Sequence, residues 1–201
     1  MADTKNPKGM VYVDSSNFFH SLRRIGLSMY HIDFRRLAQM LLMGHELVEI
    51  RYYAAPLDQA AVPKLYASQQ RYWANLRKAG VKLKLGYMQD NFFECKKCGK
   101  KRQGIVCPEC KYEFAKVTEK GVDVHIAADL VYHASLSKFD WAYLNSSDGD
   151  LAGACERVRM LGKKVVYVCV PPIESTALKT ACNYTATKDA TFFSGVHIAD
   201  R

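Results

Sequence analysis

The sequence predicts an α/β fold with a central, mostly parallel sheet and helices packed on both of its faces. Three observations predict it: short apolar segments of strand-like character, longer segments with apolar residues at helical spacing, and a regular alternation of the two along the chain. Such alternation is typical of parallel sheets, in which a helix connects each strand to the next. With 201 residues, the chain is long enough for one sizeable domain and a small addition.

The first half of the chain is expected to supply three strands and two helices. The strands are predicted over residues 10–17, 47–55 and 81–88, and the helices over 34–43 and 61–80. The last of these strands alternates apolar and polar residues, as a half-buried strand does. The second helix should stop at Gly80, because glycine readily adopts the left-handed conformation that ends many helices.

The second half resumes the alternation after a cysteine-rich interruption. Helices are predicted over 119–136 and 151–162, and strands over 141–147 and 164–170. Beyond Pro172 the pattern predicts a helix over 174–185 and a short edge strand over 191–195. Ligands of such sheets bind beyond the carboxyl ends of the strands, so the residues that follow the strands are the candidates for a site.

The composition is that of a globular protein with a basic surface. Hydrophobic residues make up 49% of the chain, and 29 Lys and Arg against 20 Asp and Glu give a net charge of +9. This surplus favours a polyanionic partner such as RNA or DNA. No apolar run reaches the roughly 18 residues that cross a bilayer, and the polar N-terminus MADTKNPKG carries no export signal. We therefore expect a cytoplasmic protein with no membrane partner; a homodimer is left open.

Four of the seven cysteines have the spacing of a zinc site. Cys95, Cys98, Cys107 and Cys110 form the pattern C-x2-C-x8-C-x2-C, in which two tight turns each present two thiolates to one tetrahedral ion. Disulfides are rare in the cytosol, which favours metal binding. Because all four ligands are sulfur, the zinc should be structural, and it should supply most of the folding energy of this short segment, on the order of 10 kcal/mol. We expect a zinc-ribbon insertion here. The remaining cysteines should be small buried hydrophobic residues: Cys155, Cys169 and Cys182.

Two basic segments are candidates for contact with nucleic acid. The predicted ribbon carries five cations within seven residues: Lys96, Lys97, Lys100, Lys101 and Arg102. They form either a solvated loop surface or a set of phosphate contacts. The segment RYWANLRKAG offers Arg71, Tyr72, Trp73 and Arg77, whose aromatic rings suit either base stacking or core packing.

Acidic residues follow two of the predicted strands. Asp14 ends the first strand, and Asp148 and Asp150 follow the strand over 141–147. Because parallel strands end at the same edge of a sheet, we expect these acids to face one crevice. Asp148 is either a cation ligand or a cap of the helix that follows, and Asp150 has the same two interpretations.

The helix after the cysteines adds a third acid. Asp123 is followed at helical spacing by apolar residues of the same face: Ala127, Leu130, Val131 and Ala134. A carboxylate on an apolar face is costly unless a cation meets it, although the dipole at the first turn of a helix also stabilises an acid. We favour a position of Asp123 in the crevice of Asp14 and Asp148.

The opposite side of that helix carries His125, Asp129 and His133 at successive steps of four residues. This spacing is compatible with a transition-metal site. A solvated polar face with local hydrogen bonds is the commoner arrangement, and we favour it here.

Three segments together resemble the signature blocks of NYN domains, a family of the PIN-like nuclease superfamily. VYVDSSNFF holds Asp14 and Asn17, KGVDVHIAADLV holds Asp123 after Lys120, and DWAYLNSSDGDLAGACERVRMLGKKVVYV holds Asp148 and Asp150. The blocks occur in the family's order. Ser15 and Ser147 stand where the family usually has glycine.

The resemblance implies a fold, an activity and a set of site residues. It implies a three-layer PIN-like domain formed by residues 1–89 and 114–201, with the ribbon inserted over 90–113. Members of the family are similar in being metal-dependent endoribonucleases, so RNA is the expected partner, ahead of DNA. The implied catalytic residues are Asp14, Asn17, Asp123, Asp148 and Asp150. Converging carboxylates repel one another, and Mg²⁺ or Mn²⁺ held by Asp14, Asp123 and Asp148 would relieve that repulsion.

Two other functions compete with the nuclease. The first is a non-catalytic module that binds nucleic acid through the ribbon. The second is a protein-interaction adaptor that uses the zinc ribbon as a docking surface. The acidic set argues against both.

Overall fold

The computed structural model describes residues 6–114 and 116–197. Its centre is a six-stranded sheet in the order β12-β11-β10-β1-β2-β3, and every pair of neighbouring strands is parallel. The strands are β1 (Lys8–Asp14), β2 (Glu46–Ala54), β3 (Lys82–Leu85), β10 (Trp141–Asn145), β11 (Lys164–Cys169) and β12 (Tyr184–Thr187). The α/β prediction with a central parallel sheet is therefore confirmed.

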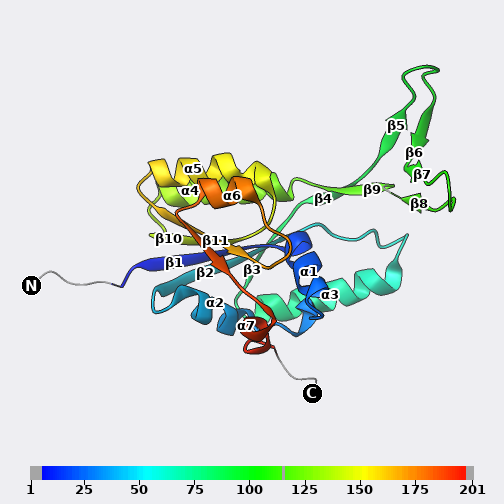
Figure 1. Cartoon of the computed structure of the whole chain (residues 1–201). Helices are drawn as coiled ribbons and strands as arrows, with labels where there is room; N and C mark the ends of the chain where they lie inside the picture. Colours follow the sequence, from blue (N-terminus) through cyan, green and yellow to red (C-terminus); the bar gives the residue numbers. More distant parts are fainter. Residues whose placement is uncertain (1–5, 115, 198–201) are drawn as a thin grey trace, which may run out of the picture.

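Helices cover both faces of this sheet, which makes three layers (Figure 1). One face is covered by α4 (Val122–Ser135), α5 (Ala152–Met160) and α6 (Thr176–Ala181). The other carries α1 (Ser15–Arg24), α2 (Phe34–Leu42), α3 (Pro63–Lys78) and α7 (Ala190–Ser194). Two short 3-10 helices, η1 (Met29–His31) and η2 (Gly149–Leu151), complete these layers.

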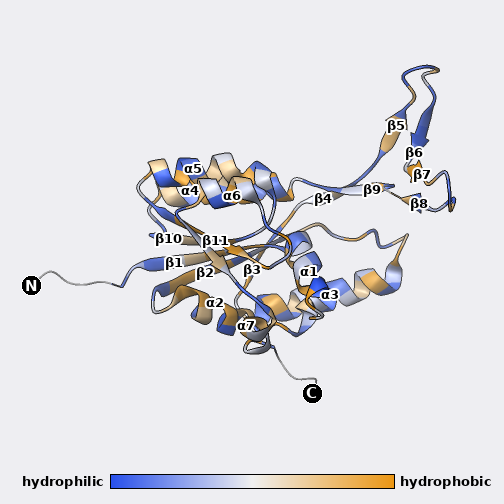
Figure 2. Ribbon diagram, in the orientation of Figure 1, coloured by the Kyte–Doolittle hydropathy of each residue, from blue (hydrophilic) through white to orange (hydrophobic). Residues whose placement is uncertain are grey.

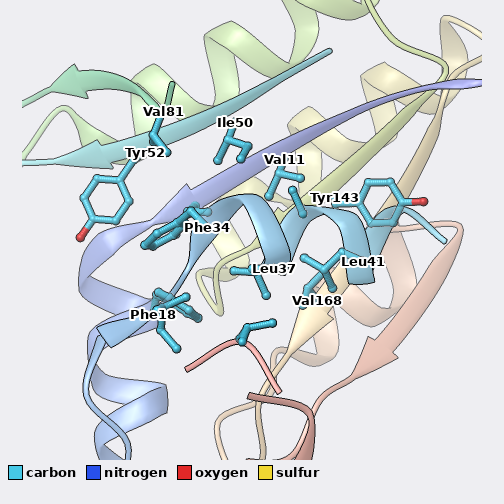
Figure 3. Close-up of a cluster of buried hydrophobic side chains, with 14 of the residues drawn as sticks. Val11, Phe18, Phe34, Leu37, Leu41, Ile50, Tyr52, Val81, Tyr143 and Val168 are labelled. Carbon is cyan, nitrogen blue, oxygen red and sulfur yellow. The ribbon is translucent and has the colours of Figure 1, made fainter. Parts of the chain in front are cut away.

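Each face of the sheet has its own hydrophobic core because successive side chains of a strand point to opposite sides. In β1, Val11 and Val13 pack toward α1 and α2, while Met10 and Tyr12 pack toward α4. Figure 3 shows the first core, where Phe18, Phe34 and Leu37 gather beneath the strands. Burial on both sides explains why these strands read as continuous apolar runs. Figure 2 shows apolar residues in the strands of the sheet and on the helices that cover it.

A narrow projection interrupts the fold between β3 and α4 (Figure 1). Its base is the antiparallel pair β4 (Tyr87–Asp90) and β9 (Val117–Lys120). Beyond them lie two short hairpins, β5 (Phe92–Glu94) with β6 (Lys101–Gln103), and β7 (Ile105–Val106) with β8 (Glu113–Phe114). We call residues 91–114 the finger; it contains the four clustered cysteines.

Several predicted boundaries differ from the structure. The strand predicted over 81–88 is two strands, because the chain turns at Gly86, where a Cβ atom would lie 2.3 Å from the carbonyl oxygen of Lys120. The helix predicted from residue 119 starts at Val122, after β9. Helix α1 was not predicted. Asp14 caps it, and its short apolar face follows the first strand without a break.

The C-terminal predictions are partly wrong. The helix expected over 174–185 is only α6, and the chain then forms the edge strand β12. The edge strand expected over 191–195 is instead helix α7. Asp189 accepts a 2.9 Å hydrogen bond from the backbone N–H of Phe192, so a helix cap decides a segment whose aromatic residues suggested a strand. In residues 6–114 and 116–197, no helix is long and apolar enough to cross a membrane.

Candidate active site

Asp14 lies at the carboxyl end of β1, in the middle of the sheet, and only 1% of it is exposed. Its Oδ1 accepts a 3.1 Å hydrogen bond from the backbone N–H of Asn17, which caps α1. Its Oδ2 accepts from Asn17 Nδ2 at 2.7 Å and from Ser146 Oγ at 2.9 Å. Burial nevertheless raises the pKa of Asp14, these hydrogen bonds oppose the rise, and the nearby charge of Asp148 adds to it. Asn17 thus positions Asp14.

Asp148 follows the neighbouring strand, β10, whose Asn145 is paired with Val13 of β1. The Ser146 hydroxyl that donates to Asp14 also accepts a 3.1 Å hydrogen bond from the backbone N–H of Asp148. Asp148 is also the N-cap of η2: its Oδ1 accepts a 2.9 Å hydrogen bond from the backbone N–H of Asp150. Its Oδ2 has no hydrogen-bond partner among the described residues. Capping and ligand binding are therefore compatible roles for this residue, while Asp150 is exposed.

Asp123 occupies the first turn of α4 and is half-buried. Its pKa is raised by burial and then by the charges of Asp14, Asp148 and Asp150. These charges act at short range in a partly desolvated environment. Asp123 therefore lies near the acids of β1 and β10, as expected.

Glu119, on β9, is a further carboxylate of this site that the sequence analysis missed. Its Oε2 accepts a 3.0 Å hydrogen bond from the backbone N–H of Ala55 at the end of β2. Burial and the charges of Asp14 and Asp123 raise its pKa to about 7, against the opposing effect of the Ala55 N–H. The available signal was its position four residues before Asp123, but a helix was predicted where β9 lies.

The acids named above form a cluster without a cationic partner. None of them makes an ion pair with another residue in the described part of the chain. Mutual repulsion and an all-oxygen donor set fit a hard divalent cation. As placed, however, no three His, Cys, Asp or Glu side chains of residues 6–114 and 116–197 are arranged so that they could hold a metal ion. The carboxylates are close enough to repel one another but do not surround one point.

The cysteines of the finger form two turns of the same geometry. In each turn the first cysteine makes two backbone hydrogen bonds. The N–H of Cys95 donates to the C=O of Lys100, and its C=O accepts from the N–H of Gly99. Cys107 makes the same two bonds with Tyr112 and Lys111. Gly99 and Lys111 both have a left-handed backbone, with φ of 69° and 61°. Backbone N–H groups within each turn lower the pKa of the Cys95 and Cys107 thiols. Each turn thus favours a thiolate, as a zinc-binding turn must, although the two pairs are not brought together into one group.

The basic residues of the finger are exposed. Two of them face acids of the same finger, with Lys101 Nζ 3.5 Å from Glu94 and Arg102 Nη2 3.6 Å from Glu113. Lys96, Lys97 and Lys100 form no ion pair with a described residue and surround the first cysteine turn. On α3, Trp73 belongs to the core and Tyr72 is half-buried, whereas Arg71 and Arg77 are exposed.

The expectation of a solvated polar face on α4 was wrong for two of its three residues. His133 is 2% exposed, and its Nδ1 lies 2.9 Å from the hydroxyl of Tyr12. Asp129 pairs with Arg51 at 2.6 Å and accepts from the Tyr53 hydroxyl at 2.9 Å. These partners come from β1 and β2, so local helical spacing could not reveal them. The buried face of α4 instead runs through Val122, Ile126, Leu130, His133 and Ala134.

The architecture is that of a PIN-like α/β domain with carboxylates at the ends of its strands. The sequence pattern of the NYN domain matches residues 8–189, and the chain belongs to this family of nucleases. The structure is similar to the crystal structure of a protein of unknown function from Vibrio parahaemolyticus RIMD 2210633, with a TM-score of 0.65 and 20% identity over 96% of this chain and 99% of that chain. This likeness shows the fold alone. No curated protein matches the chain.

Proposed function

We propose that the protein is a metal-dependent endoribonuclease that hydrolyses phosphodiester bonds at the carboxylates of the sheet edge. The main support is the cluster of Asp14, Asp123 and Asp148, which lie close enough for the charge of Asp148 to raise the pKa of Asp14 and for both charges to raise that of Asp123. None of the three forms an ion pair with a cation among the described residues. Because the chain belongs to a nuclease family, a cluster of this kind at the strand ends supports catalysis over a purely structural role. RNA is preferred over DNA only because of the resemblance to NYN endoribonucleases.

The proposed roles follow from the contacts of each residue. Asp14, Asp123 and Asp148 do not surround one point without a cation, and they would have to move together to hold Mg²⁺ or Mn²⁺. The bound ion would supply an activated water and stabilise charge on the phosphate oxygens. Asn17 and Ser146 fix the orientation of the Asp14 carboxylate through three hydrogen bonds. Asp150, and Glu119 in its ionised form, add negative charge next to these three acids, which favours the binding of a cation.

Asp148→Asn tests this proposal. Asparagine retains the shape and caps a helix about as well as aspartate, but it removes one charge from the cluster. Cleavage of a labelled single-stranded RNA in Mn²⁺ should fall by orders of magnitude, while the melting temperature stays the same or rises and binding in EDTA persists. Asp33→Asn is the matched control, since Asp33 caps α2 through the N–H groups of Arg35 and Arg36 and lies outside the cluster. Equal cleavage by both variants would remove Asp148 from the active site.

We further propose that the four cysteines of the finger bind one structural zinc ion. The identical geometry of the two turns and the lowered thiol pKa values support this proposal. Elemental analysis should find about one zinc per chain in reduced protein. Zinc-free, fully folded protein would contradict it. The division of the chain into a body of residues 1–89 and 114–201 and an insertion over 90–113 is part of the same proposal.

The finger is also the proposed phosphate-binding element. Replacement of Lys96, Lys97, Lys100, Lys101 and Arg102 by Gln should flatten the dependence of RNA affinity on salt, because fewer counterions are released. An unchanged slope would place the nucleic acid elsewhere.

The alternative is a non-catalytic module, and one observation favours it. Exposed aromatic residues accompany the lysines of the finger, including Tyr112 and Phe114, whose rings lie parallel with centroids 6.5 Å apart. Such rings suit either stacking on nucleic acid or docking of a protein. RNA binding without cleavage in any divalent metal would support this alternative.

A further inference from the structure

A cavity of about 500 Å³ adjoins the carboxylates on the α1 and α3 side of the sheet. Residues at the end of β2 line it, and β9 contributes Glu119 to the lining. Ser15 and Ser16, which directly follow Asp14, line the same cavity. The cavity therefore begins where the carboxylate cluster ends.

Aromatic side chains dominate the wall away from the acids. Tyr30 is 53% exposed, and its ring packs edge-on against Tyr72, with centroids 4.9 Å apart and an angle of 78°. Tyr72 is held in turn by a 3.4 Å hydrogen bond from its hydroxyl to the carbonyl oxygen of Met29. Phe19 of α1 also lines the cavity. A planar ring entering this space would meet the exposed ring of Tyr30 and the ring of Tyr72, which its hydrogen bond holds in place.

The polar part of the wall is held in place before any ligand binds. Gln69 of α3 donates to the carbonyl oxygen of Ala55 at 3.1 Å and accepts from the N–H of Leu57 at 3.0 Å. The N–H of Ala55 donates to Glu119. A single backbone segment thus connects the aromatic wall to the carboxylates, and this fixes the distance between a ring in the cavity and a phosphate at the acids.

We propose that this cavity receives the base of the nucleotide next to the cleaved phosphodiester, and that the substrate is therefore single-stranded. The proposal rests on the proposed nuclease function and names its substrate class. The cavity volume is within the range of pockets that enclose small molecules, and aromatic walls bind bases by stacking with little preference among them. A base that is stacked and paired in a duplex cannot enter a lateral cavity, whereas an unpaired base can.

The test measures binding in EDTA, so that it does not depend on cleavage. The probes are a short labelled oligouridylate, the same backbone without bases, and the matching duplex. Tyr30→Ala should weaken binding of the oligouridylate about tenfold or more, the loss expected for one stacked base. Tyr30→Phe keeps the ring and should bind as the unmodified protein does.

Tyr184→Ala is the matched control, because Tyr184 is also 53% exposed and stacks on one ring, that of Trp141. It lies on β12, away from the cavity, and should leave affinity unchanged. The base-free backbone and the duplex should bind weakly, and their affinity should not depend on Tyr30. Equal binding of the three probes, or equal losses in Tyr30→Ala and Tyr184→Ala, would overturn the proposal, as would no binding at all.

The outcomes also separate this proposal from the nuclease. Base-dependent binding through Tyr30 without cleavage in Mg²⁺ or Mn²⁺ would support the base pocket and contradict the endoribonuclease function. Cleavage that depends neither on the Tyr30→Ala substitution nor on the presence of bases would support the nuclease function and contradict the base pocket.

Discussion

The carboxylate cluster and the cysteine finger are assembled in opposite ways. The acids come from β1, β9, α4 and the loop after β10, far apart in sequence. β1, β10 and α4 are held in place by the two hydrophobic cores, and β9 is attached through the hydrogen bond between the Ala55 N–H and Glu119. The cysteines are neighbours in sequence, but Gly104 alone is buried among residues 91–114. A core can bring distant groups together without a ligand. Two local turns with no core between them depend on a ligand to do so.

Catalysis should depend on the body and hardly on the finger, and this contrast has the largest expected effect. Asp123→Asn should slow Mn²⁺-dependent cleavage more than about 100-fold, the upper end of the cost of losing even an outer partner of a metal ligand. Lys97→Gln should leave the rate at saturating RNA unchanged. Single-turnover kinetics would measure both, and similar losses would mean that the finger belongs to the catalytic site.

Stability should show the same contrast. Leu130 of α4 is fully buried, so Leu130→Ala should lower the free energy of unfolding by about 2–5 kcal/mol. Phe92 of the finger is 62% exposed, and Phe92→Ala should change it by less than about 0.5 kcal/mol. Urea unfolding monitored by circular dichroism would measure both values. A large loss for Phe92→Ala would show that the finger is part of the cooperative unit.

The acidic cluster should also make the body less stable as the pH rises. The pKa of Glu119 is about 7 in the folded state and about 4.5 when unfolded, so the folded state binds more protons between these values. The contribution of Glu119 to the free energy of unfolding is therefore fully present below about pH 4.5 and is lost as the pH rises through 7. The expected loss is about 1–2 kcal/mol, since partial exposure screens the effect. Melting curves of the apo protein should show a smaller pH dependence in Glu119→Gln, and an identical dependence would contradict the assigned cause.

The smallest effect is expected on the body when the finger is disrupted. Cys98→Ser should abolish zinc binding and the hydrogen-exchange protection of finger amides, because the remaining thiolates cannot complete a tetrahedral site. The melting temperature of the body should stay the same. If the melting temperature of the body fell together with the amide protection of the finger, the two regions would not be independent.

The sequence predicted those features that depend on local patterns or on general rules of sheets. The proximity of Asp14 and Asp148 was predicted because parallel strands end at a common edge, and the two turns of the cysteine pairs because their spacing is local. Glu119 was missed because a four-residue strand precedes α4 without a recognisable break. Asp129 and His133 were misassigned because their partners, Arg51 and Tyr12, lie far away in sequence. The C-terminal segment was misread because one cap at Asp189 outweighs the strand preference of Phe192 and Phe193.

The finger leaves and re-enters the body at one place, since Tyr87 of β4 pairs with Lys120 of β9 and Asp90 with Val117. The residues beyond this ladder connect β4 to β9 as the loop of a hairpin does. The entropy cost of closing such a loop changes only slowly with its length. The finger is therefore exchangeable: Asp90 and Val117 could be joined through a tight Asn-Gly turn, or a different binding element could be grafted there. Such an exchange would leave the carboxylates at the strand ends in place, because they belong to elements outside the ladder of β4 and β9.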